Sequence, residues 1–227
     1  MASKNKNPWD DYADIYMEKM GREGDYWNRE LILPPLFRLC GDDLTGKRAL
    51  DLGCGFGHVA MMLEERGAAV VGLDSSEVLL EEARHEAGQR GSSVEFILSD
   101  ASMLPFTDED FDLIVCNMAL QDFADADAAL REAARVSRPG ARAIFAIRHP
   151  WTDGWLGDYH ECQAIHTPLQ PEWQGRSPRS HYPPRYHRPL DYYLNASVAA
   201  ELAFVHCEEI VCDDSLLVVL LVVERKG

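Results

Sequence analysis

Short apolar runs alternate with amphipathic segments along most of the chain, and this alternation is typical of an α/β protein. The first run, at residues 47–52, leads into a glycine-rich turn at 53–57. Further apolar runs of strand length follow at 69–73, 94–99 and 111–116. These runs predict four buried strands separated by helices.

Helical patterns fill the segments between the predicted strands. A helix is expected over 58–67, and a second is expected over 75–88, where Ser75-Ser76-Glu77 has capping chemistry. Residues 125–138 carry alanine and aliphatic side chains at helical spacing, and Arg138-Pro139-Gly140 is expected to end that helix. The helices and strands together predict crossover connections between parallel strands.

This regular rhythm is interrupted between residues 148 and 187, after a fifth strand expected at 143–147. The segment 148–187 is rich in proline and therefore predicts a shaped loop rather than a helix. It also carries many aromatic and histidine side chains, which suit a flat small molecule, so substrate specificity is expected there. A final helix opening at 186–194 and a last strand at 216–224 complete the predicted core.

The N-terminal residues 1–45 are expected to form a helical lid that is rich in aromatic side chains. Tyr16 and Trp27 are candidates to close over a bound ligand. The alternative is that these aromatics are the apolar sides of helices packed on the sheet.

Composition narrows the function classes. The 227 residues suffice for one α/β domain with a lid, and the formal charge of −16 disfavours nucleic acid and anionic membranes as partners. No apolar run approaches the roughly 20 residues that span a bilayer, and no signal-peptide core is present. The six cysteines form no C-x-x-C pair and are expected to be reduced, so a cytoplasmic protein is expected. We expect a monomer or a homodimer.

The turn after the first strand carries the most informative chemistry. Gly53, Gly55 and Gly57 allow a sharp turn and a close approach of the backbone to a ligand. Their G-x-G-x-G spacing differs from the G-x-G-x-x-G of dinucleotide sites, and Asp51 would repel a pyrophosphate. A nicotinamide oxidoreductase is therefore disfavoured. A cofactor with cationic sulfonium and ammonium groups suits the carboxylate of Asp51.

Two further acids stand at the ends of the next predicted strands. Asp74 could accept hydrogen bonds from both hydroxyls of a ribose, and Asp100 could accept one from an adenine amino group. The turn D-x-G-x-G-x-G followed by two strand-end acids resembles the class I S-adenosylmethionine-dependent methyltransferases. Within that family, the chain is most similar to small-molecule methyltransferase domains of the type 11 kind.

Other segments carry the same resemblance. Residues 100–106 follow the family pattern D-A-x-x-L-P-F, whereas Ser137 and Ala141 replace a leucine and a glycine that are usual before the fifth strand. His149-Pro150 and Tyr186-His187-Arg188 are similar to motifs of a subgroup that methylates small molecules. The departures fall in a turn expected to lie far from the cofactor.

The resemblance spans residues 28–224 and implies a Rossmann-like, doubly wound, seven-stranded, mostly parallel α/β sheet. It implies a single domain, with the lid at 1–45, the cofactor-binding core at 46–227 and the insertion at 148–187. The implied cofactor is S-adenosyl-L-methionine, with S-adenosyl-L-homocysteine as product. The implied cofactor-binding residues are Asp51, Gly53, Gly55, Asp74, Ser75, Asp100, Ala101 and Asn117.

A methyl transfer of this kind needs an oriented acceptor and, for some acceptors, a base. Histidines titrate near neutrality, so His149 and then His187 are the candidate catalytic bases; the alternatives are a hydrogen-bonding role for either residue, or no base at all. A metal is not expected, because His160-Glu161-Cys162 and His166 lack the H-E-x-x-H spacing. The candidate substrate-binding residues are Tyr16, Trp27, Gln121, Trp151 and Tyr186.

These observations predict methyl transfer to a small aromatic or heterocyclic molecule by in-line displacement, with His-assisted deprotonation as an option. Asn117 is not followed by the N-P-P-Y pattern of nucleic-acid amino methylation. Two alternatives remain open. The first is a cofactor-binding relative that catalyses a rearrangement, cyclisation or elimination, and the second is a nonenzymatic scaffold.

Overall fold

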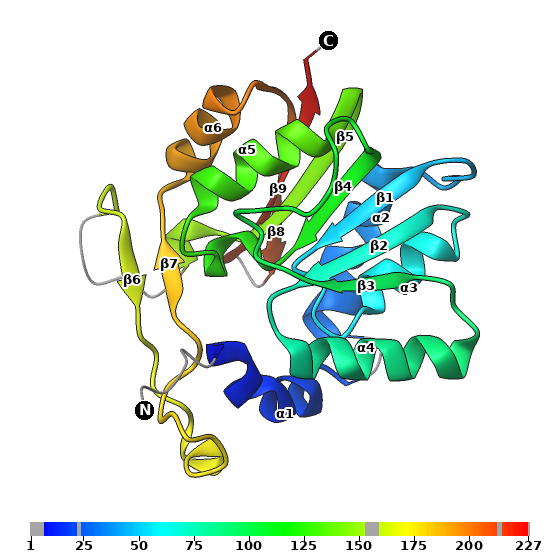
Figure 1. The fold of residues 1–227 in the computed structure, drawn as a ribbon. Coiled ribbons are helices and arrows are strands. Elements are labelled where there is room, and N and C mark those ends of the chain that lie inside the picture. Colours follow the sequence, from blue (N-terminus) through cyan, green and yellow to red (C-terminus); the bar gives the residue numbers. More distant parts are fainter. Residues whose placement is uncertain (1–6, 22–23, 153–158, 213–214, 227) are drawn as a thin grey trace, which may run out of the picture.

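The computed structural model describes residues 7–21, 24–152, 159–212 and 215–226. In this part of the chain, a seven-stranded sheet has the order β3-β2-β1-β4-β5-β9-β8 (Figure 1). Strands β1 to β5 are parallel, and β9 and β8 run antiparallel to their neighbours. The strands are β1 (Arg48–Leu52), β2 (Ala69–Asp74), β3 (Glu95–Leu98), β4 (Phe111–Asn117), β5 (Ser137–Arg148), β6 (Gln163–Ile165), β7 (Arg185–His187), β8 (Leu202–Cys212) and β9 (Ser215–Arg225).

Helices cover both faces of the sheet. Apolar residues of α2, α3 and α4 form one buried cluster with the sheet, and those of α5 and α6 form a second cluster on the opposite face. The helices are α1 (Pro8–Met20), α2 (Leu33–Cys40), α3 (His58–Glu64), α4 (Glu77–Arg90), α5 (Ala126–Val136) and α6 (Leu190–Ala199). Shorter turns are the π-helical η1 (Trp27–Ile32) and the 3₁₀ turns η2 (Leu120–Asp122), η3 (Pro150–Thr152) and η4 (Pro171–Trp173).

Strand β4 shows how the sheet is shared between the two clusters. Leu113 and Val115 belong to the cluster of α2, α3 and α4, whereas Ile114 and Cys116 belong to the cluster of α5 and α6. Successive side chains of a strand point to opposite faces, and both faces of this strand are apolar. A continuous apolar run is therefore needed here, as expected for a parallel sheet covered on both sides.

The strand order reverses between β1 and β4. Leu50 of β1 pairs with Val71 of β2 on one side and with Ile114 of β4 on the other, all in parallel. Ligands of open α/β sheets bind beyond the carboxyl ends of the strands at such a reversal. Helix α1 and the small sheet of β6 and β7 lie on the side of the main sheet where these strands end (Figure 1).

The expected end of the helix at 125–138 differs from the structure. Helix α5 ends at Val136, and Pro139-Gly140 lies inside β5, between Ser137, which pairs with Phe111, and Arg142, which pairs with Leu113. The residue before a proline is disfavoured in helical conformation, so the chain becomes extended two residues earlier than expected. The fifth strand is correspondingly longer than the predicted 143–147.

The segment before the last helix was also predicted incorrectly. Tyr186 and His187 do not open a helix; they belong to β7, which pairs with β6 at Ala164 and Gln163. Helix α6 begins only at Leu190, directly after Pro189. Strands of three residues are too short to give a periodic signal, so the sequence pattern did not predict the sheet of β6 and β7.

Candidate functional site

A cavity of about 370 Å³ lies at the reversal of strand order. It is lined by the glycine turn after β1, by the ends of β2, β3 and β4, by helix α1 and by the insertion before β7. Its lining residues include Asn7, Trp9, Tyr16, Gly53, Gly55, Asp74, Ser75, Asp100, Ala101, Asn117, Met118, Asp122, Phe123, Pro184 and Tyr186.

The glycine turn contributes Gly53 and Gly55, which have no side chain, to the cavity wall. Gly53 and Gly55 have φ values of 75° and 56°, which favour glycine. A Cβ on Gly53 would stand 2.5 Å from the Cβ of Ala119, so a side chain would displace the segment after β4. The Gly53 N–H also donates to the Leu73 carbonyl at 2.8 Å, which joins the turn to β2.

Asp74 holds together the elements around the cavity. Its Oδ2 accepts from the Gly55 N–H at 2.8 Å, and its Oδ1 accepts from the Ser76 N–H at 2.9 Å. Burial raises the pKa of this carboxyl above its usual value, although the backbone N–H groups oppose the shift. Ser76 also caps α4 and donates to Asp10 of α1 at 2.7 Å, so the same loop anchors α1 over the cavity.

Asp51 lies in the protein interior behind the glycine turn. Its side chain is buried, and Oδ2 has no hydrogen-bond partner in the described part of the chain. Burial raises the pKa of this carboxyl to about 8, and the nearby Asp74 adds to the shift. Asp51 does not itself line the cavity. A buried acceptor of this kind would be stabilised by a cation bound nearby.

A chain of amides fixes the orientation of Asn117 at the end of β4. The side-chain amide of Asn28 donates to Asp25 Oδ1 at 3.1 Å, so its Oδ1 is left to accept from Asn117 Nδ2 at 3.0 Å. Asn117 Oδ1, an acceptor, then points away from Asn28, and it is buried without a partner among the described residues, at the cavity wall. Asn28 stands in the π-helical turn η1, and such turns recur at functional sites.

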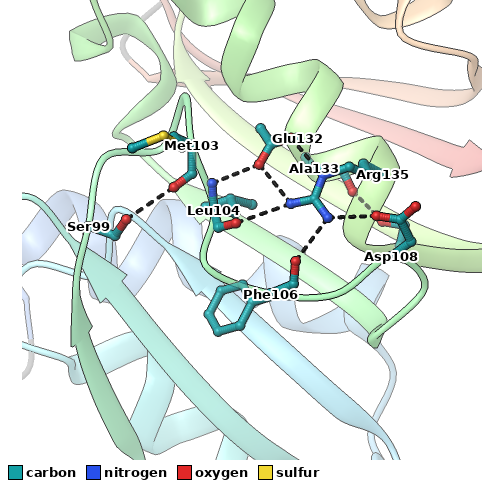
Figure 2. Close-up of polar contacts among 9 residues, drawn as sticks. Ser99, Met103, Leu104, Phe106, Asp108, Glu132, Ala133 and Arg135 are labelled. Atoms are coloured by element: carbon teal, nitrogen blue, oxygen red, sulfur yellow. Dashed lines mark hydrogen bonds and ion pairs between the residues drawn. The ribbon is translucent and has the colours of Figure 1, made fainter.

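The loop after β3 is clamped by helix α5 (Figure 2). Arg135 donates through Nη2 to the Leu104 carbonyl at 3.1 Å and through Nη1 to the Phe106 carbonyl at 2.9 Å. Its Nη1 also lies 2.7 Å from Asp108, and the Leu104 N–H donates to Glu132 at 2.7 Å. These contacts satisfy the backbone of a segment that has no ladder partner of its own.

Asp100 and Ala101 stand at the cavity end of this clamped loop. Asp100 Oδ1 accepts from the Ser102 N–H at 2.8 Å and from the Ser102 hydroxyl at 2.7 Å. Both residues line the cavity. The contacts with α5 therefore fix the position of the loop that forms this part of the cavity wall.

Tyr16 places a phenol at the acidic end of the cavity. The Tyr16 pKa is raised above its usual value, first by burial and then by the negative charges of Asp74, Asp122, Asp25 and Asp51. An enclosed site with this many carboxylates favours a cationic ligand. The unpartnered oxygens of Asp51 and Asn117 fit the same requirement, so the donor set suits a cofactor with sulfonium and ammonium groups.

The sequence-predicted substrate residues are not all at the cavity. Tyr16 and Tyr186 line it, whereas Gln121 is buried beside it and donates through Nε2 to the Met118 carbonyl. Trp27 and Trp151 are 41% and 69% exposed and do not line it. The spacing of aromatic residues in the sequence did not show which of them line the cavity and which face solvent.

The two candidate bases also lie away from the cavity lining. His149 is buried, with Nε2 at 3.1 Å from Glu209 and Nδ1 accepting from the Trp151 N–H at 3.2 Å. His187 is buried with Nε2 at 2.9 Å from the Tyr159 carbonyl. Each imidazole thus contacts protein groups, and neither is among the residues that line the cavity.

Sequence reasoning missed several residues that line the cavity. Asn7, the N-cap of α1, and Trp9 of α1 line it, and Pro184 lines it from the insertion. Met118 lines it with a positive φ of 58°, a conformation that is strained for a side chain of this size. Met118 had a signal that could have been used, namely its place directly after the end of a predicted parallel strand.

In the described ranges, no group of three or more His, Cys, Asp and Glu side chains is arranged to hold a metal ion. Nor does any helix described by the structure combine the length and apolar character needed to cross a bilayer.

Comparisons with known proteins agree with this geometry. Residues 50–145 match the family model described as a methyltransferase domain. The demethylmenaquinone methyltransferase of Thermus thermophilus is 45% identical over 113 residues, which cover 49% of this chain and 51% of that protein. The ubiquinone biosynthesis O-methyltransferase of Coxiella burnetii is 30% identical over 131 residues, which cover 54% and 56% respectively.

A solved structure shows the same fold. The S-adenosylmethionine-dependent methyltransferase of Mesorhizobium loti superposes with a TM-score of 0.65 at 24% identity, covering 84% of this chain and 96% of that one. The chain spans only about half the length of the curated relatives described above.

The strand order and the glycine turn at its reversal define the seven-stranded α/β sheet of S-adenosylmethionine-dependent methyltransferases. The sequence matches within and beyond residues 50–145 agree with that class. Residues 50–145 thus match a methyltransferase domain, and the described part of the chain has the fold of S-adenosylmethionine-dependent methyltransferases.

Proposed function

We propose that the cavity binds S-adenosyl-L-methionine. Asp74, beside Ser75, would accept from the ribose hydroxyls, and Asp100 with Ala101 would contact the adenine. Asn117 and Asp51 would stabilise the ammonium and sulfonium groups above Gly53 and Gly55. The observation that carries this proposal is the buried, unpartnered oxygen of Asp51 behind a turn that excludes side chains.

We further propose that the protein methylates a small aromatic molecule. The two curated relatives described above are named for quinone compounds, and this supports an aromatic acceptor for the present chain. Tyr186 and Pro184 would contact the acceptor, because they line the cavity from β7 and from the residue just before it. Phe123 adds an apolar ring at the same wall.

The bound cofactor would supply an electrophilic methyl group, so the chain's own task is to orient the acceptor and exclude water. Tyr16 would close the acidic end of the cavity from α1. The proposed histidine bases would need to rotate away from their present partners to reach the acceptor. In the proposed mechanism, orientation of the acceptor therefore contributes more than deprotonation by His149 or His187.

The test is release of S-adenosyl-L-homocysteine from S-adenosyl-L-methionine in the presence of catechols, hydroquinones and naphthols. Release that depends on one acceptor class supports the proposal. Asp74→Ala should lower the release at subsaturating cofactor, whereas Asp191→Ala, an exposed acid on α6, should leave it unchanged.

The alternatives give different results in the same experiment. Binding of the cofactor with chemical conversion of the acceptor but no homocysteine release would establish the rearrangement, cyclisation or elimination alternative. No binding of either cofactor form would leave the scaffold alternative.

A further inference from the structure

A second cavity, of about 530 Å³, lies on the face of the sheet covered by α2 and α3. It shares no lining residue with the first cavity. Its wall comes from η1, α2, the loop after α2, α3 and the end of α4. The lining residues are Arg29, Leu33, Pro34, Phe37, Arg38, Asp42, His58, Met62, Glu65, Arg66 and Arg90.

The charge of this lining is opposite to that of the whole chain. Four arginines face two acids, Asp42 and Glu65, in a protein with a formal charge of −16. Guanidinium groups gathered in one cavity offer several charged donors to an anion, although Glu30, Glu86 and Glu208 each lie beside one of them.

Three of the four arginines have few competing partners. The guanidinium of Arg29 is 4.0 Å from Glu30, and that of Arg90 is 3.8 Å from Glu86. Arg66 donates to the Met62 carbonyl at 2.7 Å, which occupies one of its five donors. Arg38 differs, because both oxygens of Glu208 accept from its Nη2.

A buried polar side chain also faces this cavity. His58 is almost completely buried, and among the residues that the structure describes neither of its ring nitrogens has a hydrogen-bond partner. Burial and the charge of Arg90 lower the pKa of this imidazole to about 4, against the opposing charge of Asp25. An unpartnered buried polar group costs stability, so its presence calls for a ligand that satisfies it.

Apolar surface completes the cavity. Leu33, Pro34 and Phe37 line it from α2, and Met62 lines it from α3. The guanidinium of Arg66 lies 3.9 Å from the centre of the Phe37 ring, which fixes a cation beside an aromatic face. A ligand with both an apolar body and a negative group would contact both parts of this wall.

We propose that this cavity is a binding site for a small amphipathic organic anion, such as an aromatic carboxylate. Its carboxylate would accept from Arg29, Arg66 and Arg90. The carboxylate would also accept from a ring N–H of His58, and the aromatic ring would lie against Phe37 and Met62. The cavity volume is that of a small-molecule site.

The site lies directly behind the glycine turn. His58 opens α3, and its ring stacks on Phe56 with centroids 5.1 Å apart. The Phe56 ring in turn lies 5.8 Å from that of Tyr16, which lines the first cavity. The anion site is nevertheless independent of the proposed methyl transfer, because it is defined by its own residues.

Binding of benzoate, measured by ligand-observed NMR and calorimetry, tests the proposal. Benzamide has nearly the same shape without the charge, so it should bind about tenfold more weakly or not at all, the change expected when charge-assisted hydrogen bonds are lost. Saturating S-adenosyl-L-methionine should not displace benzoate. Equal binding of the two compounds, or displacement of benzoate by the cofactor, would overturn the assignment.

Variants locate the site. The double variant Arg29→Gln/Arg90→Gln removes two cations with exposed or half-exposed side chains, and should weaken benzoate binding by about tenfold or more. His58→Leu should also weaken it. Arg131→Gln removes an exposed arginine on α5 and is the matched control. An equal loss in this control, or no loss in the double variant, would show that benzoate does not occupy this cavity.

Discussion

Replacing Asp51 by Asn is predicted to stabilise the cofactor-free protein and to weaken its binding of S-adenosyl-L-methionine. Asp51 is buried, one of its oxygens has no partner, and its pKa is raised from 3.8 to about 8, chiefly by burial. Near neutral pH the unfolded chain carries an ionised Asp51, whereas the folded chain holds a protonated one. Folding therefore requires proton uptake at this position.

The magnitude follows from this difference in protonation. At about pH 7 the shift from 3.8 destabilises the folded protein by about 4 kcal/mol, at about 1.4 kcal/mol for each pH unit. Asn is neutral in both states and has no such cost. Its Nδ2 becomes a buried donor, which offsets about 1–3 kcal/mol, so a net gain of about 1–3 kcal/mol is expected.

The dependence on pH identifies the cause. The pKa of Asp51 is higher in the folded than in the unfolded protein. The contribution of Asp51 to the stability of the wild type is therefore fully present below the unfolded value of 3.8, and it is lost as pH rises towards about 8. The advantage of Asp51→Asn should therefore be absent near pH 4, grow with pH, and level off above about pH 8.

Urea unfolding of both proteins across this pH range measures the effect, with and without S-adenosyl-L-methionine. The cofactor should stabilise the wild type more than the variant, because a bound cation favours the ionised carboxylate. If the cofactor-free variant is less stable than the wild type at neutral pH, or if its advantage does not depend on pH, the reasoning about Asp51 is wrong.

Four further changes test other parts of the site. Asp74→Ala should weaken S-adenosyl-L-methionine binding in calorimetry by about 1–3 kcal/mol; unchanged affinity would refute the ribose contact. Asn28→Leu leaves Asn117 free to rotate and should weaken the same binding about tenfold, the loss of roughly one hydrogen bond. Arg135→Met leaves two loop carbonyls without their donor and should lower the free energy of unfolding by about 1–3 kcal/mol, measured in urea. His149→Ala should lower stability while the turnover of the folded protein is kept; a large loss of turnover with unchanged cofactor affinity would instead make His149 the base.

The local sequence was sufficient to predict the glycine turn after β1. Gly53 and Gly55 are adjacent to a strand and to Asp51 in sequence, and their conformations are set by that short segment. Asp74 and Asp100 could be placed at the same edge because the carboxyl ends of parallel strands meet there. The cavity in the structure brings Gly53, Gly55, Asp74 and Asp100 together.

Long-range side-chain geometry could not be read from the sequence. Asn28 and Asn117 are 89 positions apart, and their hydrogen bond depends on the π-helical turn that presents Asn28. His149 follows the fifth strand as expected, yet its ring turns to Glu209 on β8. Periodicity and motif spacing define where a backbone runs, but not which neighbours a side chain meets.

The central claim is that the cavity at the reversal of strand order binds S-adenosyl-L-methionine. Calorimetric titration of the purified protein with S-adenosyl-L-methionine, repeated with Asp74→Ala, tests it most directly. The account predicts saturable one-site binding that is weakened in the variant. Absence of binding to the folded wild-type protein, or equal affinity in both proteins, would contradict it.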